Sequence, residues 1–312
     1  MNKPHQIDYD RLGPGRASSS VAASQAVGYC ERDFLNVAKV PPLHKVLPPA
    51  IMMPESGLVD FSKELGLDWP ATMPNLLAGN NKLGAGESTL VAETAGALVL
   101  LVLDGSGALV SQDETVELHP GDIALVPGGQ GIRATAGNTG LSYFFVDDSP
   151  LVSYLGWKVS PTERSAFTHF PAELLKEKLD EYEAAGITAS GVFLSHAGLP
   201  EEKLATPHLF AHLNRLMPGA RNTVHAHAAP ALTYVIHGGN NCFSLLGEPL
   251  VNGEIQDPAR VDWADGQLSI TPPNLWHGHF NDGDEPILSL VIQPAGLYYN
   301  DRTMNFIFAD KQ

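Results

Sequence analysis

Apolar runs separated by polar turn residues occupy two separate stretches of the chain, and each stretch predicts a group of short β-strands. From about residue 76, apolar runs such as LVLLVLDGSGALV are broken by Gly, Asp and Pro. Such runs bounded by turn residues are typical of strands. The pattern returns from about residue 206, in APALTYVIHGG and PILSLVIQPAG. We therefore predict two β domains, at 76–158 and 206–312.

The segment 159–205 between them predicts a helical linker. It contains FPAELLKEKLDEYEAAG, in which Leu174, Leu175 and Leu179 have helical spacing. Gly186 follows as a stop signal, so the pattern predicts a helix from Pro161 to about Ala185.

Residues 1–75 contain many Pro, Gly and Ser residues and little periodicity. Such composition is typical of loops. We expect an N-terminal arm that packs on a neighbouring domain or subunit.

An internal repeat relates the two β regions. At one constant offset, the segment from Leu83 to Ala92 aligns with that from Leu216 to His225, and Leu98 to Gly105 aligns with Ala231 to Gly238. Further along, the Gly-x5-Pro segment that begins at Gly121 is repeated from Gly266. Repeated sequence units predict repeated folds.

Composition limits the function classes. A hydrophobic content of 44% over 312 residues supports a globular core, and the net charge of −16 argues against nucleic-acid binding. Two cysteines suit a reducing compartment. The N-terminal residues lack an apolar signal region, and the longest apolar run is too short for a membrane span. We expect a cytoplasmic protein with neither nucleic-acid nor membrane partners.

Histidines are the candidate chemistry of the second β region. His225 and His227 are two residues apart, as are His277 and His279. Residues i and i+2 of a strand point to the same face, so His225, His227 and His277 can converge on one point. Neutral imidazoles bind Fe, Zn, Cu and Ni, and a three-histidine set leaves coordination positions open. We predict these three residues as metal ligands.

The first β region lacks these histidines. In the repeat, Ala92 and Thr94 take the positions of His225 and His227, and Ile132 takes that of His277. We therefore expect the first region to be a structural copy without a metal site.

The two histidine motifs resemble those of the cupin superfamily. Its first motif aligns with Gly219, His225, His227 and Gly238, with Ala231 at the usual glutamate position. Its second motif aligns with Gly266, Pro272, His277 and Asn281, with Asn274 at a glycine position. Two copies resemble a bicupin. The implied fold is all-β, with two double-stranded β-helix (jelly-roll) barrels joined by the helical linker.

The three-histidine form with W-H-x-H-x-N in the second motif resembles the gentisate and salicylate 1,2-dioxygenases. This resemblance implies an extradiol-type ring-cleaving dioxygenase that uses Fe(II) and O2 on a hydroxylated aromatic substrate, active as a homodimer or homotetramer. Zn, Mn or Ni could replace the iron. The family usually holds its iron in the first barrel, whereas here the ligands are in the second.

Further residues are candidates for substrate contact. His279 is a candidate acid or base on the strand of His277. Arg221, Thr233, Tyr234 and Trp276 are candidate substrate-binding residues. Thr233 stands where the family has an arginine that holds the substrate carboxylate, so the resemblance leaves open whether the substrate carries one.

Two other functions compete with the dioxygenase. One is a metal-dependent isomerase, lyase or hydrolase that acts on a small polar acid. The other is a ligand-binding bicupin without turnover. Oxygen consumption distinguishes the dioxygenase from the isomerase, lyase or hydrolase. A binding bicupin is expected to hold no transition metal, or one whose removal changes only stability.

Overall fold

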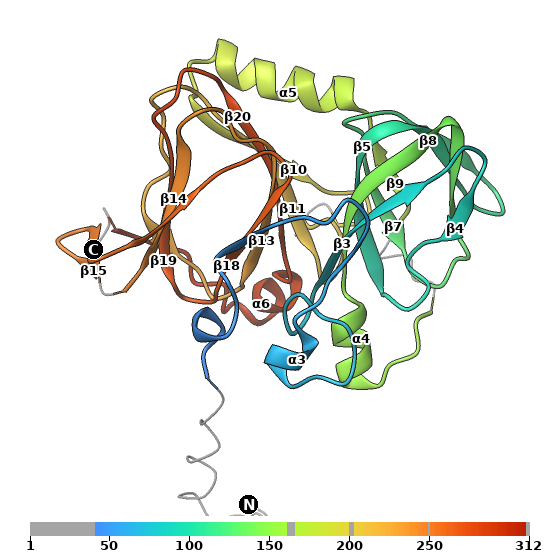
Figure 1. Ribbon diagram of the computed structural model, residues 1–312, viewed down its shortest axis with the longest axis horizontal. Coiled ribbons are helices and arrows are strands. Elements are labelled where there is room, and N and C mark those ends of the chain that lie inside the picture. Colours follow the sequence, from blue (N-terminus) through green and yellow to red (C-terminus); the bar gives the residue numbers. More distant parts are fainter. Residues whose placement is uncertain (1–40, 161–165, 200–202, 249, 310–312) are drawn as a thin grey trace, which may run out of the picture. The chain divides into compact units, whose positions relative to one another are not determined.

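Strands dominate the described chain and form two groups, drawn in green and in orange in Figure 1. The structure is a computed structural model that describes residues 41–160, 166–199, 203–248 and 250–309. Residues 1–40 of the expected arm and 161–165 of the expected helix lie outside the described residues. Residues 42–312 form one unit by their contacts. Division of the unit into the domains 76–158 and 206–312 stays a prediction.

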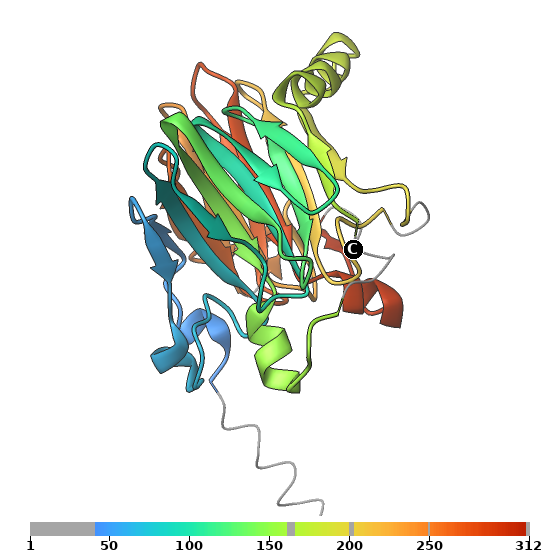
Figure 2. The same ribbon diagram turned by 90° about the vertical axis from the view of Figure 1, so that its right-hand side faces the viewer.

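The first barrel is one sheet with the strand order β2-β3-β8-β5-β7-β9, to which β4 and β6 add through β8 and β5. Figure 2 shows its long strands from the side. Its strands are β2 (Gly57–Val59), β3 (Leu77–Leu83), β4 (Ser88–Leu90), β5 (Ala97–Val110), β6 (Thr115–Leu118), β7 (Ile123–Pro127), β8 (Arg133–Asp147) and β9 (Thr168–Phe170). Apolar side chains fill its interior, including those of Ala92, Leu98, Leu100 and Ile132.

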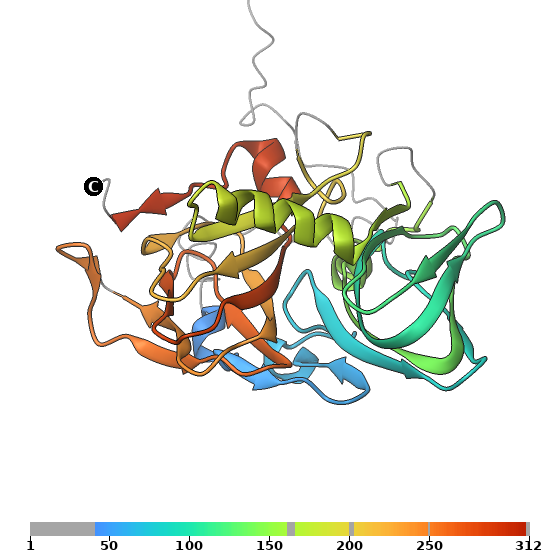
Figure 3. The ribbon, with the colours of Figure 1, turned by 90° about the horizontal axis from the view of Figure 1, so that it is seen from above.

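The second barrel consists of two sheets, with the orders β1-β18-β13-β20-β11-β10 and β17-β14-β19-β12-β21. The first sheet contains β1 (Ala50–Met52), β10 (Ala189–Leu194), β11 (Phe210–Leu216), β13 (Ala231–His237), β18 (Gln267–Thr271) and β20 (Ile287–Gln293). The second contains β12 (His225–Ala226), β14 (Cys242–Gly247), β17 (Ala259–Asp262), β19 (Trp276–Asn281) and β21 (Ile307–Phe308). A separate hairpin joins β15 (Leu250–Val251) and β16 (Glu254–Ile255). Seen from above, the red C-terminal strand lies at the margin of this barrel (Figure 3).

The sequence repeat corresponds to a repeat in strand register. Leu98 pairs with Val126 in the first barrel, and the aligned Ala231 pairs with Thr271 in the second. The partner strands are β7 in the first barrel and β18 in the second. The turn before each of them contains a glycine in the left-handed region, Gly121 with φ 88° and Gly266 with φ 76°. Residues with a Cβ rarely adopt this conformation, which explains why both turns carry glycine.

A shared hydrophobic core joins the outer faces of the two barrels. Leu232, Leu290 and Ile292 of the second barrel are buried in one cluster with side chains of the first barrel. At its centre the rings of Phe144 and Tyr234 stack, with centroids 4.3 Å apart and an angle of 23° between the rings. The side chains that face away from each barrel's interior therefore hold the barrels together.

The described part of the N-terminal arm contributes to both barrels. Strand β1 pairs with β18, with Ala50 opposite Ser269, whereas β2 pairs with β3, with Gly57 opposite Asn80. A short 3-10 helix, η3 (Leu43–Lys45), precedes β1, and α3 (Ser62–Leu65) follows β2. These residues of the arm therefore add one edge strand to each group of strands.

The linker helix α5 runs from Ala172 to Ala184 and is shorter than predicted. Residues 168–170 form strand β9 instead, because their backbone pairs with that of β7. The N–H of Ala172 then donates to Asp122 Oδ1 at 2.9 Å, which gives the helix N-terminus a partner in the first barrel.

The buried face of α5 follows the predicted spacing only in part. Leu175 and Leu179 are buried in the core between the barrels, whereas Leu174 is exposed. Gly186, with φ 76°, ends the helical turn as expected. Two shorter helices, α4 (Ser149–Leu155) and α6 (Gly296–Asp301), were not predicted. In Figures 1 and 2, α4 lies at the opposite end of the strands from α5. Among the described helices, none has the length and apolarity needed to cross a membrane.

The Phe144–Tyr234 stack predicts a structural role for Tyr234. Replacing Tyr234, which is 5% exposed, with Ala should lower the free energy of unfolding by about 3 kcal/mol through lost burial and stacking. Urea denaturation measures the change. Tyr154→Ala, at a position 68% exposed, is the control and should cost less than about 0.5 kcal/mol. Equal stability of the two variants would contradict the packing role.

Candidate metal centre

Three histidines meet inside the second barrel because two of its strands are paired in register. His225 of β12 and His277 of β19 are direct cross-strand partners, and their ring centroids are 4.3 Å apart. His227 follows β12, with its ring centroid 4.8 Å from that of His277. One nitrogen from each histidine lies within 4.8 Å of the other two. Within the described ranges, this is the one group of three or more His, Cys, Asp or Glu residues with such spacing.

Each of the three rings is held by a backbone carbonyl. The Nδ1 atoms of His225, His227 and His277 lie 2.8, 2.6 and 2.8 Å from the carbonyl oxygens of Thr223, Ala229 and Leu275. A carbonyl can only accept, so each Nδ1 carries the proton and each Nε2 keeps a lone pair. A hydrogen bond of this kind fixes the tautomer of a metal-binding histidine.

Burial keeps the cluster neutral. It lowers the pKa of His227 to about 4 and the pKa of His277 well below its usual range, and proximity to other imidazoles adds to both effects. Burial also lowers the pKa of His225. Three neutral imidazoles that each keep an Nε2 lone pair fit a divalent transition metal, which requires deprotonated ligands.

His279 lies on the same inward face as His277, but a different partner sets its tautomer. Its Nδ1 is 2.8 Å from Ser244 Oγ, and Trp263 Nε1 donates to that same oxygen at 2.8 Å. Because Trp263 only donates, the Ser244 hydroxyl has its own hydrogen available for His279 Nδ1. This chain of hydrogen bonds favours a proton on His279 Nε2. Burial lowers the pKa of His279 to about 3.

Thr233 also points into the second barrel. It is 2% exposed and lines a cavity of about 20 Å³ together with His279, Asn222 and Ser289. A cavity of this size holds about one water molecule. Thr233 therefore lies beside His279 in the interior, and its contact with a substrate stays a prediction.

Three predicted substrate residues lie away from the cluster. Arg221 is exposed, and its guanidinium lies over the Phe280 ring at 5.8 Å, on the outer face of β19. Trp276 alternates with His277 along the same strand and so faces outward. The alternation of β13 likewise turns Tyr234 outward, against Phe144. These positions do not fit contact with a ligand at the histidines.

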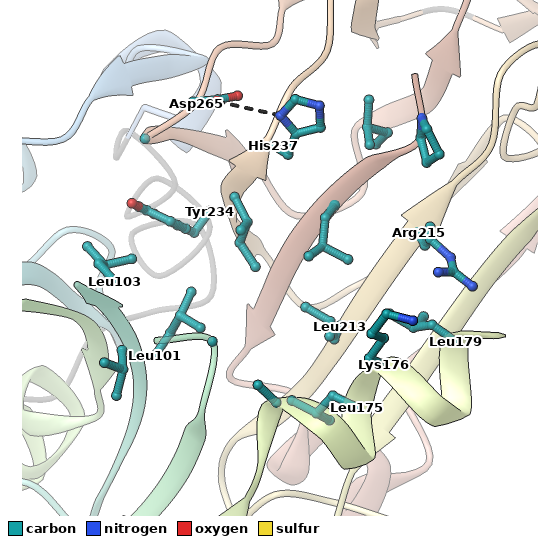
Figure 4. A pocket seen from close by; sticks show the side chains of 18 residues that line it. Leu101, Leu103, Leu175, Lys176, Leu179, Leu213, Arg215, Tyr234, His237 and Asp265 are labelled. Carbon is teal, nitrogen blue, oxygen red and sulfur yellow. Dashed lines mark ion pairs between the residues drawn. The ribbon is translucent and has the colours of Figure 1, made fainter. Parts of the chain in front are cut away.

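The pocket drawn in Figure 4 is separate from the histidines. It has a volume of about 800 Å³ and is lined by Tyr234, by leucines of both barrels and by side chains of α5. An ion pair between His237 and Asp265 lies at its border. Most of its lining is apolar, and it contains none of the three clustered histidines.

Three further residues lie close to the cluster; the sequence left His212 and Gln293 open because it does not fix which face of their strands points inward, and it did not indicate Phe306. His212 of β11 faces inward, and burial lowers its pKa to about 4, with a further contribution from His225. Gln293 Nε2 lies 3.2 Å from His227 Nε2. The Phe306 ring centroid is 5.2 Å from that of His227. Strand alternation, counted from a known register, is the signal that assigns His212 and Gln293 to the interior.

Comparison with known proteins supports the predicted resemblance. Gentisate 1,2 dioxygenase 1 of Aquipseudomonas alcaligenes is 34% identical over 97 residues, which are 31% of this chain and 25% of that protein. Gentisate 1,2-dioxygenase of Ralstonia sp is 26% identical over 120 residues, 38% of this chain and 31% of that protein. The matches thus span less than a third of the length of either relative. No family model matches the chain.

The fold comparison covers nearly the whole chain. Salicylate 1,2-dioxygenase of Pseudaminobacter salicylatoxidans superimposes with a TM-score of 0.65, over 90% of this chain and 87% of that one, at 13% identity. At this identity the likeness shows the fold. The predicted all-β bicupin fold is therefore confirmed.

The buried neutral histidines predict a pH dependence of stability. Below pH 6.5 the unfolded chain binds protons that the folded interior refuses, so the free energy of unfolding should fall from pH 7 to pH 5. His227 alone should contribute about 1 kcal/mol per pH unit in this window. Asp147 contributes in the opposite direction. Burial raises its pKa to about 6, so its folded form binds a proton more readily than its unfolded form and gains stability as the pH falls.

Urea denaturation at pH 5, 6 and 7 with a chelator present measures this dependence. His227→Gln should make it shallower, whereas His44→Gln, at an exposed position, should leave it unchanged. The same slope in the wild type and His227→Gln would contradict the buried neutral state of His227.

Proposed function

We propose that the second barrel binds Fe(II) through the Nε2 atoms of His225, His227 and His277. The proposal rests on one observation: three neutral imidazoles converge, each with Nδ1 bonded to a backbone carbonyl. Such an arrangement orients all three Nε2 lone pairs before a metal arrives. Zn, Mn or Ni can occupy the same donor set.

We further propose that the chain is a dioxygenase that cleaves a hydroxylated aromatic ring with O2. When bound, Fe(II) with three protein nitrogens offers open positions for a substrate and O2 together. The histidine ligands carry no negative charge, so the site favours an anionic oxygen donor such as a phenolate. Similarity to two gentisate dioxygenases supports an aromatic substrate.

The residues around the cluster have separate proposed tasks. His279 donates a hydrogen bond from Nε2 to a substrate oxygen, since its pKa of about 3 makes it a poor base. Thr233 offers a hydroxyl on the same inward face. Phe306, 42% exposed and next to His227, covers the cluster from the C-terminal segment and can contact an aromatic ring. Extradiol-type cleavage and a homodimeric or homotetrameric state stay predictions.

Loss of one ligand should abolish metal binding. His225→Ala and His277→Ala each remove one of three nitrogen donors, so Fe(II) affinity should fall by at least about 100-fold. Anaerobic equilibrium dialysis measures the bound metal. His237→Ala is the control, because His237 is half exposed and pairs with Glu285 outside the cluster. Full occupancy in both ligand variants would exclude this ligand set.

Oxygen uptake tests the proposed reaction. The protein, loaded with Fe(II) under anaerobic conditions, should consume one O2 per molecule of a hydroxylated aromatic acid or hydroquinone. An oxygen electrode combined with ultraviolet detection of ring loss measures the stoichiometry. Substrate conversion without oxygen uptake would instead favour an isomerase, lyase or hydrolase. Metal binding with no conversion of any phenol or diketone would favour a binding protein.

A further inference from the structure

Gln293 is a buried amide directed at the histidine cluster. It is the last residue of β20 and is 2% exposed. Its Nε2 lies 3.2 Å from His227 Nε2, the nitrogen that the proposed metal centre uses. Its Oε1 is buried and has no hydrogen-bond partner among the described residues. Leaving a buried oxygen without a partner costs free energy, so a group that pairs with Oε1 would stabilise this position.

The strand register explains why this side chain reaches the cluster. Leu232 of β13 pairs with Ile292 of β20, so the next position along brings Ala231 beside Gln293. Both face the barrel interior, opposite to the outward Leu232 and Ile292. Ala231 has only a methyl side chain, and its small size leaves room for the longer amide of Gln293.

The first barrel has a different arrangement at the same register. There Leu98 pairs with Asp147, the positions that correspond to Ala231 and Gln293. Leu98 fills the barrel interior, and the Asp147 carboxylate accepts a hydrogen bond from the Ser149 N–H at 2.9 Å. The acidic group of the first barrel is thus satisfied locally, whereas the Gln293 oxygen is not.

The orientation of the Gln293 amide depends on what His227 Nε2 binds. Because Nδ1 of His227 donates to Ala229, Nε2 carries a lone pair, which accepts from the amide NH2. A metal ion at Nε2 uses that lone pair and repels the positive end of the amide. Turning the amide over exchanges its two ends and directs Oε1 toward the cation.

We propose that Gln293 is the fourth protein group of the metal site, with Oε1 as a neutral oxygen donor to the ion. This inference rests on the metal centre of the proposed function but not on the reaction. Gln293 takes the role that a carboxylate at position 231 would have, without its negative charge. The metal thereby keeps its full positive charge for an anionic substrate.

Cobalt binding tests the proposal independently of turnover. Co(II) affinity, measured by competition with a chromogenic chelator, should fall 10- to 100-fold in Gln293→Leu, and the visible absorption of bound Co(II) should change. Gln293→Glu should bind Co(II) at least about 10-fold more tightly at pH 7, because a carboxylate adds charge. Ser269→Ala, at a buried inward position whose hydroxyl donates to the Pro49 carbonyl, is the control and should match the wild type.

The outcomes separate this inference from the proposed reaction. Wild-type affinity and absorption in a folded Gln293→Leu would overturn the role of Gln293. If that variant does not fold, Gln293→Glu decides, because unchanged affinity there also overturns it. Co(II) binding that depends on Gln293, in a protein that consumes no O2 with any phenol, supports the donor and overturns only the reaction.

Discussion

Alternation of side chains along β-strands is the constraint on which both the packing and the candidate site depend. Strand β13 shows it most clearly: Ala231 and Thr233 face the barrel interior, while Leu232 and Tyr234 enter the core between the barrels. A shift of one residue would exchange the two sets and bury the polar groups against the first barrel. The shared core and the interior site therefore fix the same register.

The two barrels share this backbone pattern but fill their interiors differently. Leu98 and Ile132 occupy the first interior, where the second has Ala231 and His277. The apolar filling stabilises the first barrel through packing. In the second, polar side chains are tolerated because His225, His227, His277 and His279 each have a backbone or hydroxyl partner. One fold thus supports a packed core in one copy and a candidate reaction site in the other.

The sequence was sufficient for the features that are local. The i, i+2 spacing of His225 and His227 and the repeat of glycine turns specify two similar barrels and a histidine cluster. It was insufficient wherever the answer depended on pairing between distant segments. Tyr234 and Trp276 were assigned to the site although their strands turn them outward, and Gln293 was left unassigned because its parity requires the register with β13. Helix α5 begins later than predicted because β9, which precedes it, pairs with β7.

The charge of the site connects these observations. A cluster of histidines is affordable in the interior only while the rings stay neutral, and burial holds the pKa of His227 near 4 and that of His279 near 3. Neutral ligands do not cancel the charge of a divalent ion, and the Gln293 amide adds an oxygen without adding charge. Since an uncompensated cation is costly in a buried setting, the missing negative charge must come from the molecule that binds there. In the proposed function a phenolate supplies it, and this requirement for negative charge is the reason that phenols are the substrates to test first.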